Sequence, residues 1–258
     1  MQIYLKNISQ LKIYFRNKFP GSYKIAYYLW WHHIRRKLWL LINKPKGVLV
    51  YVGLNKGDFF GTLYYKYEYS FGYEANPYLF NILKKKFKNK KNVKIFNLAA
   101  SNKNSVEDFY ISNNKDMVSS SLSKFSNKLI EKVGYKKSIK VRTVNLGDHL
   151  QSLNINSIDE YLSDAQGYDL VILKSLKKFI INNKIKKIIC EVTINNKINH
   201  YFEVDNFEKS FDKFLPLQYI KASKGISNLV VGKFEKVPSA YNYCDVMWIN
   251  NDFDKYNK

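Results

Sequence analysis

The stretch between Val48 and Pro77 constrains the fold of this chain more than any other part of it. It reads VLVYVGLNKGDFFGTLYYKYEYSFGYEANP. Its residue types predict a buried strand over Val48–Val52, a turn over Gly53–Gly57, the first turns of a helix over Asp58–Lys66, and a second strand over Phe71–Ala75 that Asn76 and Pro77 stop. Strand, glycine turn, helix and strand in this order are typical of the nucleotide-binding half of a doubly wound sheet.

The glycine turn and the acid that follows it suit the binding of an adenosine. Glycine lets the backbone approach a ligand closely, and the helix start offers N–H groups without a partner in the helix. Glu74 lies at the tip of the second strand, about twenty residues after the turn, where a carboxylate accepts hydrogen bonds from ribose hydroxyls. A tight turn with a solvated glutamate is the alternative, but the spacing favours a nucleotide site.

The glycine spacing differs from that of a dinucleotide-binding protein. The dinucleotide fingerprint is G-x-G-x-x-G, whereas Gly53 and Gly57 flank three residues, with Asn55 in the middle. This looser form suits a ligand without a pyrophosphate. S-adenosylmethionine is such a ligand, because it joins an adenosine to a charged amino-acid tail.

Length and cysteine usage indicate one globular domain. The chain has 258 residues, enough for an α/β domain with a sizeable core. It lacks an uncharged apolar run of about eighteen residues and a secretory signal after Met1, so we expect neither a membrane span nor secretion. Cys190 and Cys244 are the only cysteines. They fit neither a disulfide framework nor a zinc cluster, so a reducing, cytoplasmic location is expected.

The formal net charge of +22 raises the question of a nucleic-acid or anionic partner. Only four of the 43 basic residues are arginine, although specific contacts to bases and phosphates favour arginine. Lysine, asparagine, isoleucine and tyrosine are enriched together, as in a protein encoded by AT-rich DNA. We therefore interpret the charge as compositional drift more than as a polyanion-binding surface, and we do not expect a nucleic-acid partner.

Residues 1–46 precede the first predicted core strand and are rich in aromatic and basic side chains. We expect a helical extension that packs over one face of the sheet. The alternative is a surface helix that contacts an anionic membrane, with tryptophans at the interface. His32 and His33 are adjacent, so their rings cannot share one helix face, and we predict no metal site.

Further along the chain, alternating and apolar runs predict more strands and helices. Strands are expected over Val93–Ala99, Ser105–Ile111, Ile139–Val144, Ile185–Val192, Gln218–Ala222 and Cys244–Ile249, with an inserted strand over Leu229–Phe234 as a further candidate. Helices are expected over Pro77–Lys91, from Asn145, after Gly167 and over Asn206–Phe214. The polar, serine-rich segment Asn113–Lys128 is predicted to be a loop or lid.

Small and acidic residues gather at the predicted carboxyl ends of strands, the edge that lines the ligand crevice in a doubly wound sheet. Ala100 and Ser101 leave room for a ring such as adenine, although a tight turn would explain them equally well. Asp164 ends another strand, where it would act as a base or bind substrate hydroxyls, or cap the helix that follows. Glu191 falls at a third strand exit, on the same predicted edge as Glu74.

Six motifs in this order carry a resemblance to a known family. They are VYVGLNKGDFFG, FGYEANP, NLAASNKNSV, VRTVNLGDHL, SDAQGYDLVILKS and IICEV, between Val48 and Thr193. Together they resemble the FkbM family of S-adenosylmethionine-dependent methyltransferases. The resemblance implies a seven-stranded, Rossmann-like class I methyltransferase sheet over residues 47–258, with residues 1–46 as a helical extension. It also implies O-methylation, often of a sugar hydroxyl in a glycan or a glycosylated metabolite.

The resemblance implies roles for individual residues. The expected cofactor-binding set comprises Gly53, Asn55 and Gly57 along the methionine part, Glu74 at the ribose with Asn76 beside it, and Ala100 and Ser101 near adenine. Asp164 would lie near the methyl group and the acceptor hydroxyl. As a base we expect Asp164 first, with His149 and Glu191 in reserve.

One position departs from the family pattern. Two residues before the first glycine the family usually has an acid, which helps to place the ammonium end of the cofactor, and this chain has Tyr51. An active O-methyltransferase is therefore weighed against two alternatives. One is a catalytically inactive binding protein with the same sheet, and the other is a polyanion-binding protein that uses the lysine-rich surface.

Overall fold

The computed structural model describes residues 34–113, 117, 119–127, 130–131, 134–194, 205–228, 233–236 and 243–256. The chain divides into two units, Met1–Pro45 and Lys46–Lys258. In the first unit the described residues include helix α3 (Arg35–Ile42). This helix ends where the Asn43 backbone N–H donates to the Trp39 carbonyl at 2.8 Å. The rest of the predicted extension, with His32 and His33, lies outside the described residues.

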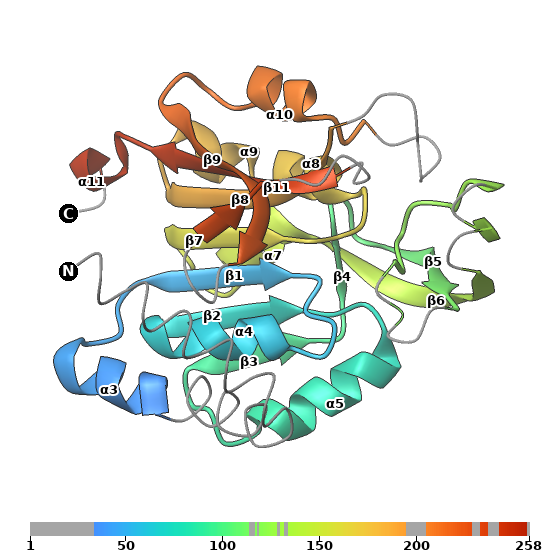
Figure 1. The fold of residues 1–258 in the computed structure, drawn as a ribbon, viewed down its shortest axis with the longest axis horizontal. Coiled ribbons are helices and arrows are strands. Elements are labelled where there is room, and N and C mark those ends of the chain that lie inside the picture. Colours follow the sequence, from blue (N-terminus) through green and yellow to red (C-terminus); the bar gives the residue numbers. More distant parts are fainter. Residues whose placement is uncertain are drawn as a thin grey trace, which may run out of the picture. The chain divides into compact units, whose positions relative to one another are not determined.

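The second unit is built on a mixed β-sheet (Figure 1). Its strands are β1 (Val48–Val52), β2 (Tyr69–Tyr73), β3 (Val93–Phe96), β7 (Ile158–Ser163), β8 (Ile185–Thr193), β9 (Tyr219–Asn228), β10 (Lys233–Glu235) and β11 (Tyr243–Asn250). Their order in space is β10-β9-β11-β8-β7-β1-β2-β3. Strands β3, β2, β1, β7 and β8 run parallel, whereas β11 is antiparallel to both β8 and β9. The predicted seven-stranded Rossmann-like sheet is confirmed, and the short β10 adds an edge strand to it.

Helices cover both faces of this sheet, as a parallel sheet requires. They are α4 (Asp58–Leu63), the 3₁₀ turn η2 (Tyr64–Lys66), α5 (Pro77–Phe87), α7 (Leu146–Ser152), α8 (Asp169–Ser175), α9 (Lys177–Ile181), α10 (Glu208–Phe214) and α11 (Phe253–Tyr256). Alternate residues of β1 point to opposite faces. Val50 and Val52 join the core cluster that α7, α8, α9 and α10 complete. The Tyr51 ring instead lies 6.0 Å from that of Phe60 in α4.

A second, three-stranded sheet stands at the end of the main sheet toward which β1 and β2 run (Figure 1). It contains β4 (Ala99–Ser101), β5 (Ser105–Ser112) and β6 (Tyr135–Asn145), in the order β4-β6-β5. Strands β4 and β6 are parallel, and β5 and β6 are antiparallel. The connection from β3 to β7 therefore builds a wall beside the carboxyl edge of the main sheet.

The prediction of one strand over Val93–Ala99 is wrong. Strand β3 ends at Phe96, and β4 begins at Ala99 in the second sheet. The break has a local cause at Asn97, whose side-chain amide donates to the carbonyls of Glu74 and Ala75 at 3.0 and 3.2 Å. These bonds fasten the chain to the end of β2 and redirect it out of the main sheet.

Other predicted boundaries move by a few residues. Strand β2 ends at Tyr73 rather than Ala75, and α5 ends at Phe87 rather than Lys91, because the lysines that follow have no apolar face to bury. The predicted start of α5 is confirmed. Asn76 is its N-cap, and its side chain accepts a hydrogen bond from the backbone N–H of Tyr78 at 3.0 Å.

Candidate active site

The predicted glycine turn is present and brings two parts of the chain into direct contact. Gly53 has a φ of 79°, and a Cβ atom at this position would lie 2.0 Å from the backbone carbonyl oxygen of Asp164. No side chain fits in that space. Asn55 and Gly57 also adopt left-handed conformations, with φ of 50° and 69°. The turn after β1 therefore packs on the backbone that follows β7.

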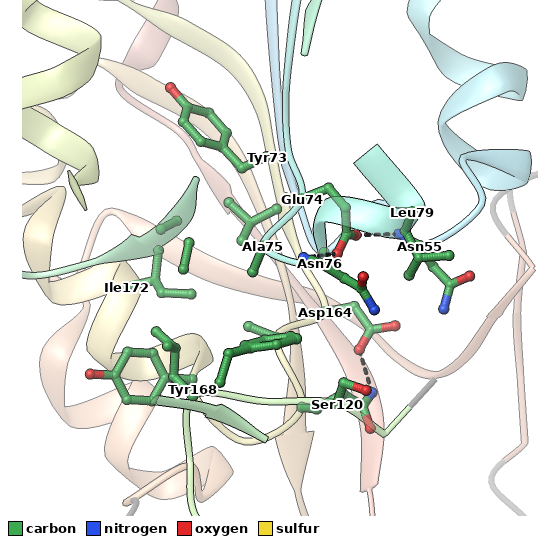
Figure 2. Close-up of a pocket in the computed structure, with 18 of the residues that line it drawn as sticks. Asn55, Tyr73, Glu74, Ala75, Asn76, Leu79, Ser120, Asp164, Tyr168 and Ile172 are labelled. Carbon is green, nitrogen blue, oxygen red and sulfur yellow. Dashed lines mark hydrogen bonds between the residues drawn. The ribbon is translucent and has the colours of Figure 1, made fainter. Parts of the chain in front are cut away.

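Glu74 fastens this turn to the start of α5. Its two carboxylate oxygens accept hydrogen bonds from the backbone N–H groups of Asn55 at 2.8 Å and Asn76 at 2.9 Å (Figure 2). The side chain is 5% exposed. Burial raises its pKa to about 7, although the two backbone hydrogen bonds act in the opposite direction. The glycine turn and the acid that were predicted to share a ligand are therefore immediate neighbours.

A cavity of about 340 Å³ opens beside Glu74 at the carboxyl edge of the main sheet. Six predicted site residues line it: Gly53, Asn55, Glu74, Asn76, Ala100 and Asp164. Further lining side chains include Leu79, Leu98, Phe109, Met117, Ser119, Ser120, Leu122, Gln166, Tyr168, Ile172 and Tyr243. Figure 2 shows Glu74 and Asn55 on one side, Asp164 in the middle, and Tyr168 and Ile172 on another side.

Asp164 stands at the polar part of this cavity. The side-chain amide of Gln166 donates to its Oδ1 at 2.6 Å and to Oε2 of Glu191 at 3.2 Å. Water reaches the Asp164 side chain, yet the surrounding protein raises its pKa to about 6, and the nearby Asp245 carboxyl adds to the rise. Burial, followed by the charge of Asp164, raises the pKa of Glu191. Asp164 does not cap α8, because the N-cap of that helix is Tyr168.

Four predicted site residues do not line the cavity. Glu191 is hydrogen-bonded to the cavity-lining residue Gln166 but does not itself line the cavity. Ser101 is fully buried in β4. A Cβ atom on Gly57 would lie 2.4 Å from the side chain of Leu83, so this glycine serves the packing of α5 against the turn.

His149 also lies away from the cavity lining. Its Nδ1 is hydrogen-bonded to the hydroxyl of Tyr73 at 2.8 Å, and its ring packs edge-on against Phe96 at 4.9 Å between centroids. Burial lowers the pKa of this histidine. The geometry fits an aromatic cluster between α7 and strands β2 and β3 better than a reserve base.

Tyr51 does not enter the cavity. It is 6% exposed, and its ring packs edge-on against Phe59 and Phe60 of α4 at 6.2 and 6.0 Å between centroids. The residue that departs from the family pattern therefore contributes to packing on the opposite face of β1, and it does not fill the cavity.

Sequence reasoning missed much of the cavity wall. Met117, Ser119, Ser120 and Leu122 come from the segment that was predicted only as a loop or lid. Tyr168 and Ile172 come from the α8 region, whose amphipathic pattern explains burial but not a place beside a ligand. The polar composition of this segment and its three consecutive serines, 119–121, marked a loop but not a cavity wall.

Among the described residues, no group of three or more histidine, cysteine, aspartate or glutamate side chains is arranged to hold a metal ion. No helix in the described parts of the chain has the length and apolar character needed to cross a membrane.

Several solved methyltransferase structures are similar to this chain at low identity. An rRNA methylase from Streptococcus thermophilus is 7% identical with a TM-score of 0.44, covering 84% of this chain and 95% of its own. TrmK from M. capricolum, in complex with S-adenosyl-homocysteine, is 11% identical with a TM-score of 0.41, covering 84% and 68%. Fibrillarin from Aeropyrum pernix, with natively bound S-adenosyl-L-methionine, is 8% identical with a TM-score of 0.44, covering 84% and 73%.

No curated protein matches the chain. A family model, by contrast, described as the methyltransferase FkbM domain, matches residues 52–218, more than half of the sequence. The match includes the glycine turn, Glu74, Asp164 and Glu191, which belong to the motifs that carried the resemblance. It confirms the resemblance, and the chain belongs to the FkbM family of S-adenosylmethionine-dependent methyltransferases.

Proposed function

We propose that this protein is an O-methyltransferase whose cavity binds S-adenosylmethionine beside Glu74 and whose Asp164 accepts the proton of an acceptor hydroxyl. The observation that carries the proposal is the convergence of three separate segments on one cavity. Gly53, Glu74 and Asp164 follow three different strands, and all three line the same hollow.

The donor side is supported by the surroundings of Glu74. A carboxylate has about four acceptor positions, and two backbone N–H groups use one on each oxygen. The remaining positions are available to ribose hydroxyls. Ala100 and Ile172 supply the kind of apolar wall against which an adenine ring packs. Asn55 and Asn76 stand beside the acid and keep it in place.

The acceptor side is supported by the state of Asp164. With a pKa of about 6, its carboxyl group is mostly ionised at pH 7, yet it is more basic than an ordinary aspartate. Bound S-adenosylmethionine supplies a methyl group on a sulfonium. Asp164 would hold the acceptor hydroxyl in line with that methyl group and take its proton as the new oxygen–carbon bond forms and the sulfur–carbon bond breaks.

We further propose a sugar hydroxyl, in a glycan or a glycosylated metabolite, as the acceptor. The resemblance suggested this class, and the polar side chains around Asp164 are compatible with it. Ser119 and Ser120 line the cavity and carry groups that hydrogen-bond to hydroxyls. We also retain three predictions from the sequence: a cytoplasmic location, a division into residues 1–46 and 47–258, and no nucleic-acid partner.

The packing of Tyr51 weakens the alternative of a catalytically inactive binding protein. This alternative depended on Tyr51, and that side chain packs against Phe59 and Phe60 of α4 and is not among the residues that line the cavity. The membrane-contact alternative depended mainly on residues before 34, which lie outside the described residues.

Two measurements test the proposal. Isothermal titration with S-adenosylmethionine should show binding, and the absence of heat at millimolar cofactor would end the enzymatic interpretation. A methyl-transfer screen over glycans should then identify an acceptor. With that acceptor, Asp164→Asn should lower turnover by about 100-fold or more, within the range that general base catalysis contributes.

The matched control is Asp108→Asn. Asp108 lies on β5 and pairs at the surface with Lys140 at 3.0 Å. It should keep wild-type turnover. Full turnover in Asp164→Asn would show that another group removes the proton.

A further inference from the structure

Gln166 occupies an unusual backbone position in the turn between β7 and α8. Its φ is 52°, in the left-handed region that side chains other than those of glycine, asparagine and aspartate rarely adopt. Gly167 follows with a φ of 87°. A left-handed residue of this kind costs about 1–2 kcal/mol, so surrounding contacts must hold it.

Ser121, which stands between the cavity-lining residues Ser120 and Leu122, provides these contacts. This side chain is 1% exposed. Its hydroxyl shares its one hydrogen between the backbone carbonyls of Gln166 at 2.9 Å and Ala165 at 3.2 Å, and its oxygen accepts a hydrogen bond from the backbone N–H of Ser123 at 3.0 Å. The backbone of Ser121 is itself paired in both directions with Tyr110 of β5. The serine segment, residues 119–123, therefore ties the second sheet to the turn that carries Asp164.

From this turn, the side chain of Gln166 extends toward the carboxyl groups of Asp164 and Glu191. Its amide nitrogen lies 2.6 Å from Oδ1 of Asp164 and 3.2 Å from Oε2 of Glu191. An amide oxygen at 2.6 Å would repel the ionised carboxyl of Asp164, so the nitrogen faces this acid. One NH₂ group thus serves two acids on neighbouring strands, each through its own hydrogen.

We propose that Gln166 is a positioning residue for methyl transfer, and that Ser121 holds Gln166 so that its amide fixes the carboxyl of Asp164 at the acceptor end of the cavity. This inference rests on the proposed function, in which Asp164 is the base. Gln166 and Ser121 can position Asp164 in this way without touching the cofactor.

The electrostatic surroundings make this support necessary. Among the residues that the structure describes, five charged or titratable groups interact electrostatically with Asp164: Tyr51 of β1, Glu74 after β2, Asp169 of α8, Glu191 of β8 and Asp245 of β11. None of these supplies a positive charge. The amide of Gln166 lowers the pKa of Asp164, whereas the surrounding protein and the Asp245 carboxyl raise it, so the amide helps to keep the carboxyl ionised and able to accept a proton.

The decisive variant is Gln166→Leu, which removes the amide at similar length. We expect turnover to fall about 10- to 100-fold, the loss of hydrogen bonds to charged groups. The acidic limb of the pH–rate profile should move up by about one pH unit, because the ionised form of Asp164 loses a donor. The Kd of S-adenosylmethionine, measured by titration calorimetry, should stay within about threefold.

Gln166→Asn keeps the inference testable if the leucine variant does not fold. Asparagine adopts the left-handed conformation more readily than glutamine, but its side chain is one methylene shorter, so its amide is too short to reach both acids. It should therefore fold at least as well as wild type and still lose turnover.

Ser121→Ala and Ser123→Ala form the matched pair. Ser123 lies in the same segment and is 4% exposed, and its hydroxyl has no hydrogen-bond partner among the described residues. Ser121→Ala should reproduce part of the turnover loss and of the pH shift, whereas Ser123→Ala should reproduce neither.

A carbon-13 NMR titration of the Asp164 carboxyl, assigned with Asp164→Asn, separates failure of this inference from failure of the proposed function. A higher titration midpoint in Gln166→Leu, together with lower turnover, supports the inference. An unchanged midpoint and unchanged turnover in both Gln166 variants would overturn it. Full turnover in Asp164→Asn would instead refute the base assignment, whatever the Gln166 variants do.

Discussion

The contact between Gly53 and Asp164 gives the sharpest prediction, for the variant Gly53→Ala. A Cβ atom would lie 2.0 Å from the carbonyl oxygen and 2.9 Å from the carbonyl carbon of Asp164, and both atoms belong to the backbone. Real Cβ atoms essentially never approach another atom within 3.0 Å, so one of the two turns must move by roughly 1 Å. The left-handed φ of 79° adds a penalty of its own.

The two costs can be estimated separately. A left-handed residue with a Cβ costs about 1–2 kcal/mol, and forcing an extra carbon into a packed site costs about 1–3 kcal/mol. The free energy of unfolding should therefore fall by about 2–5 kcal/mol, as measured by urea unfolding followed by circular dichroism. Because the movement displaces the turn that lines the cavity, affinity for S-adenosylmethionine should also fall by about tenfold or more.

Gly61→Ala is the matched control. Gly61 lies within helix α4, and the nearest atom to an added Cβ is Cζ of Phe87, at 4.0 Å. Because alanine is a better helix former than glycine, this variant should gain about 0.5–1 kcal/mol and keep its cofactor affinity. If Gly53→Ala is as stable as wild type and binds the cofactor equally well, the close approach of the two turns is wrong.

Three further predictions follow from other contacts. Glu74→Gln should weaken S-adenosylmethionine binding by about tenfold or more in calorimetry, because one acceptor for a backbone N–H becomes a donor. Burial raises the pKa of Asp169 from 3.8 to about 7, so its contribution to stability is fully present below pH 4 and is lost as the pH rises to 7. That loss is on the order of 4 kcal/mol, and Asp169→Asn should abolish it in urea unfolding at a series of pH values. Asn145→Ala should cost about 1 kcal/mol without changing cofactor affinity, since Asn145 caps α7 by accepting the Asp148 backbone N–H at 3.2 Å.

Local sequence patterns were sufficient for the elements that carry the main sheet. The apolar run of β1 has the predicted bounds, and Pro77 begins α5 as its position in the sequence indicates. These features depend on residues close together in the chain, namely the β-branched run, the turn glycines and the Asn76 cap. The contact of Glu74 with the glycine turn was also predictable, because adjacent parallel strands end at the same edge.

The rest of the cavity depends on contacts between distant residues, which a single sequence does not reveal. Asn97 turns the chain out of the main sheet by bonding to the carbonyls after β2, and only this makes Ala99–Ser101 a strand of the second sheet. Ser121 and Gln166 are 45 positions apart, and neither residue type alone indicates their bond. Gly57 lies against Leu83 of α5 and is not among the residues that line the cavity, and a single sequence does not distinguish a glycine needed for helix packing from one needed for a ligand.

The bonding of Glu74 has a thermodynamic consequence for whatever fills the cavity. Fixing a flexible side chain at a binding site costs about 0.5–1.5 kcal/mol of lost rotamer freedom. Here two backbone amides already hold the carboxylate when the chain folds. A ligand therefore meets an acid that is immobile before the encounter, and the free energy of its hydrogen bonds to that acid goes into affinity instead of into ordering the protein.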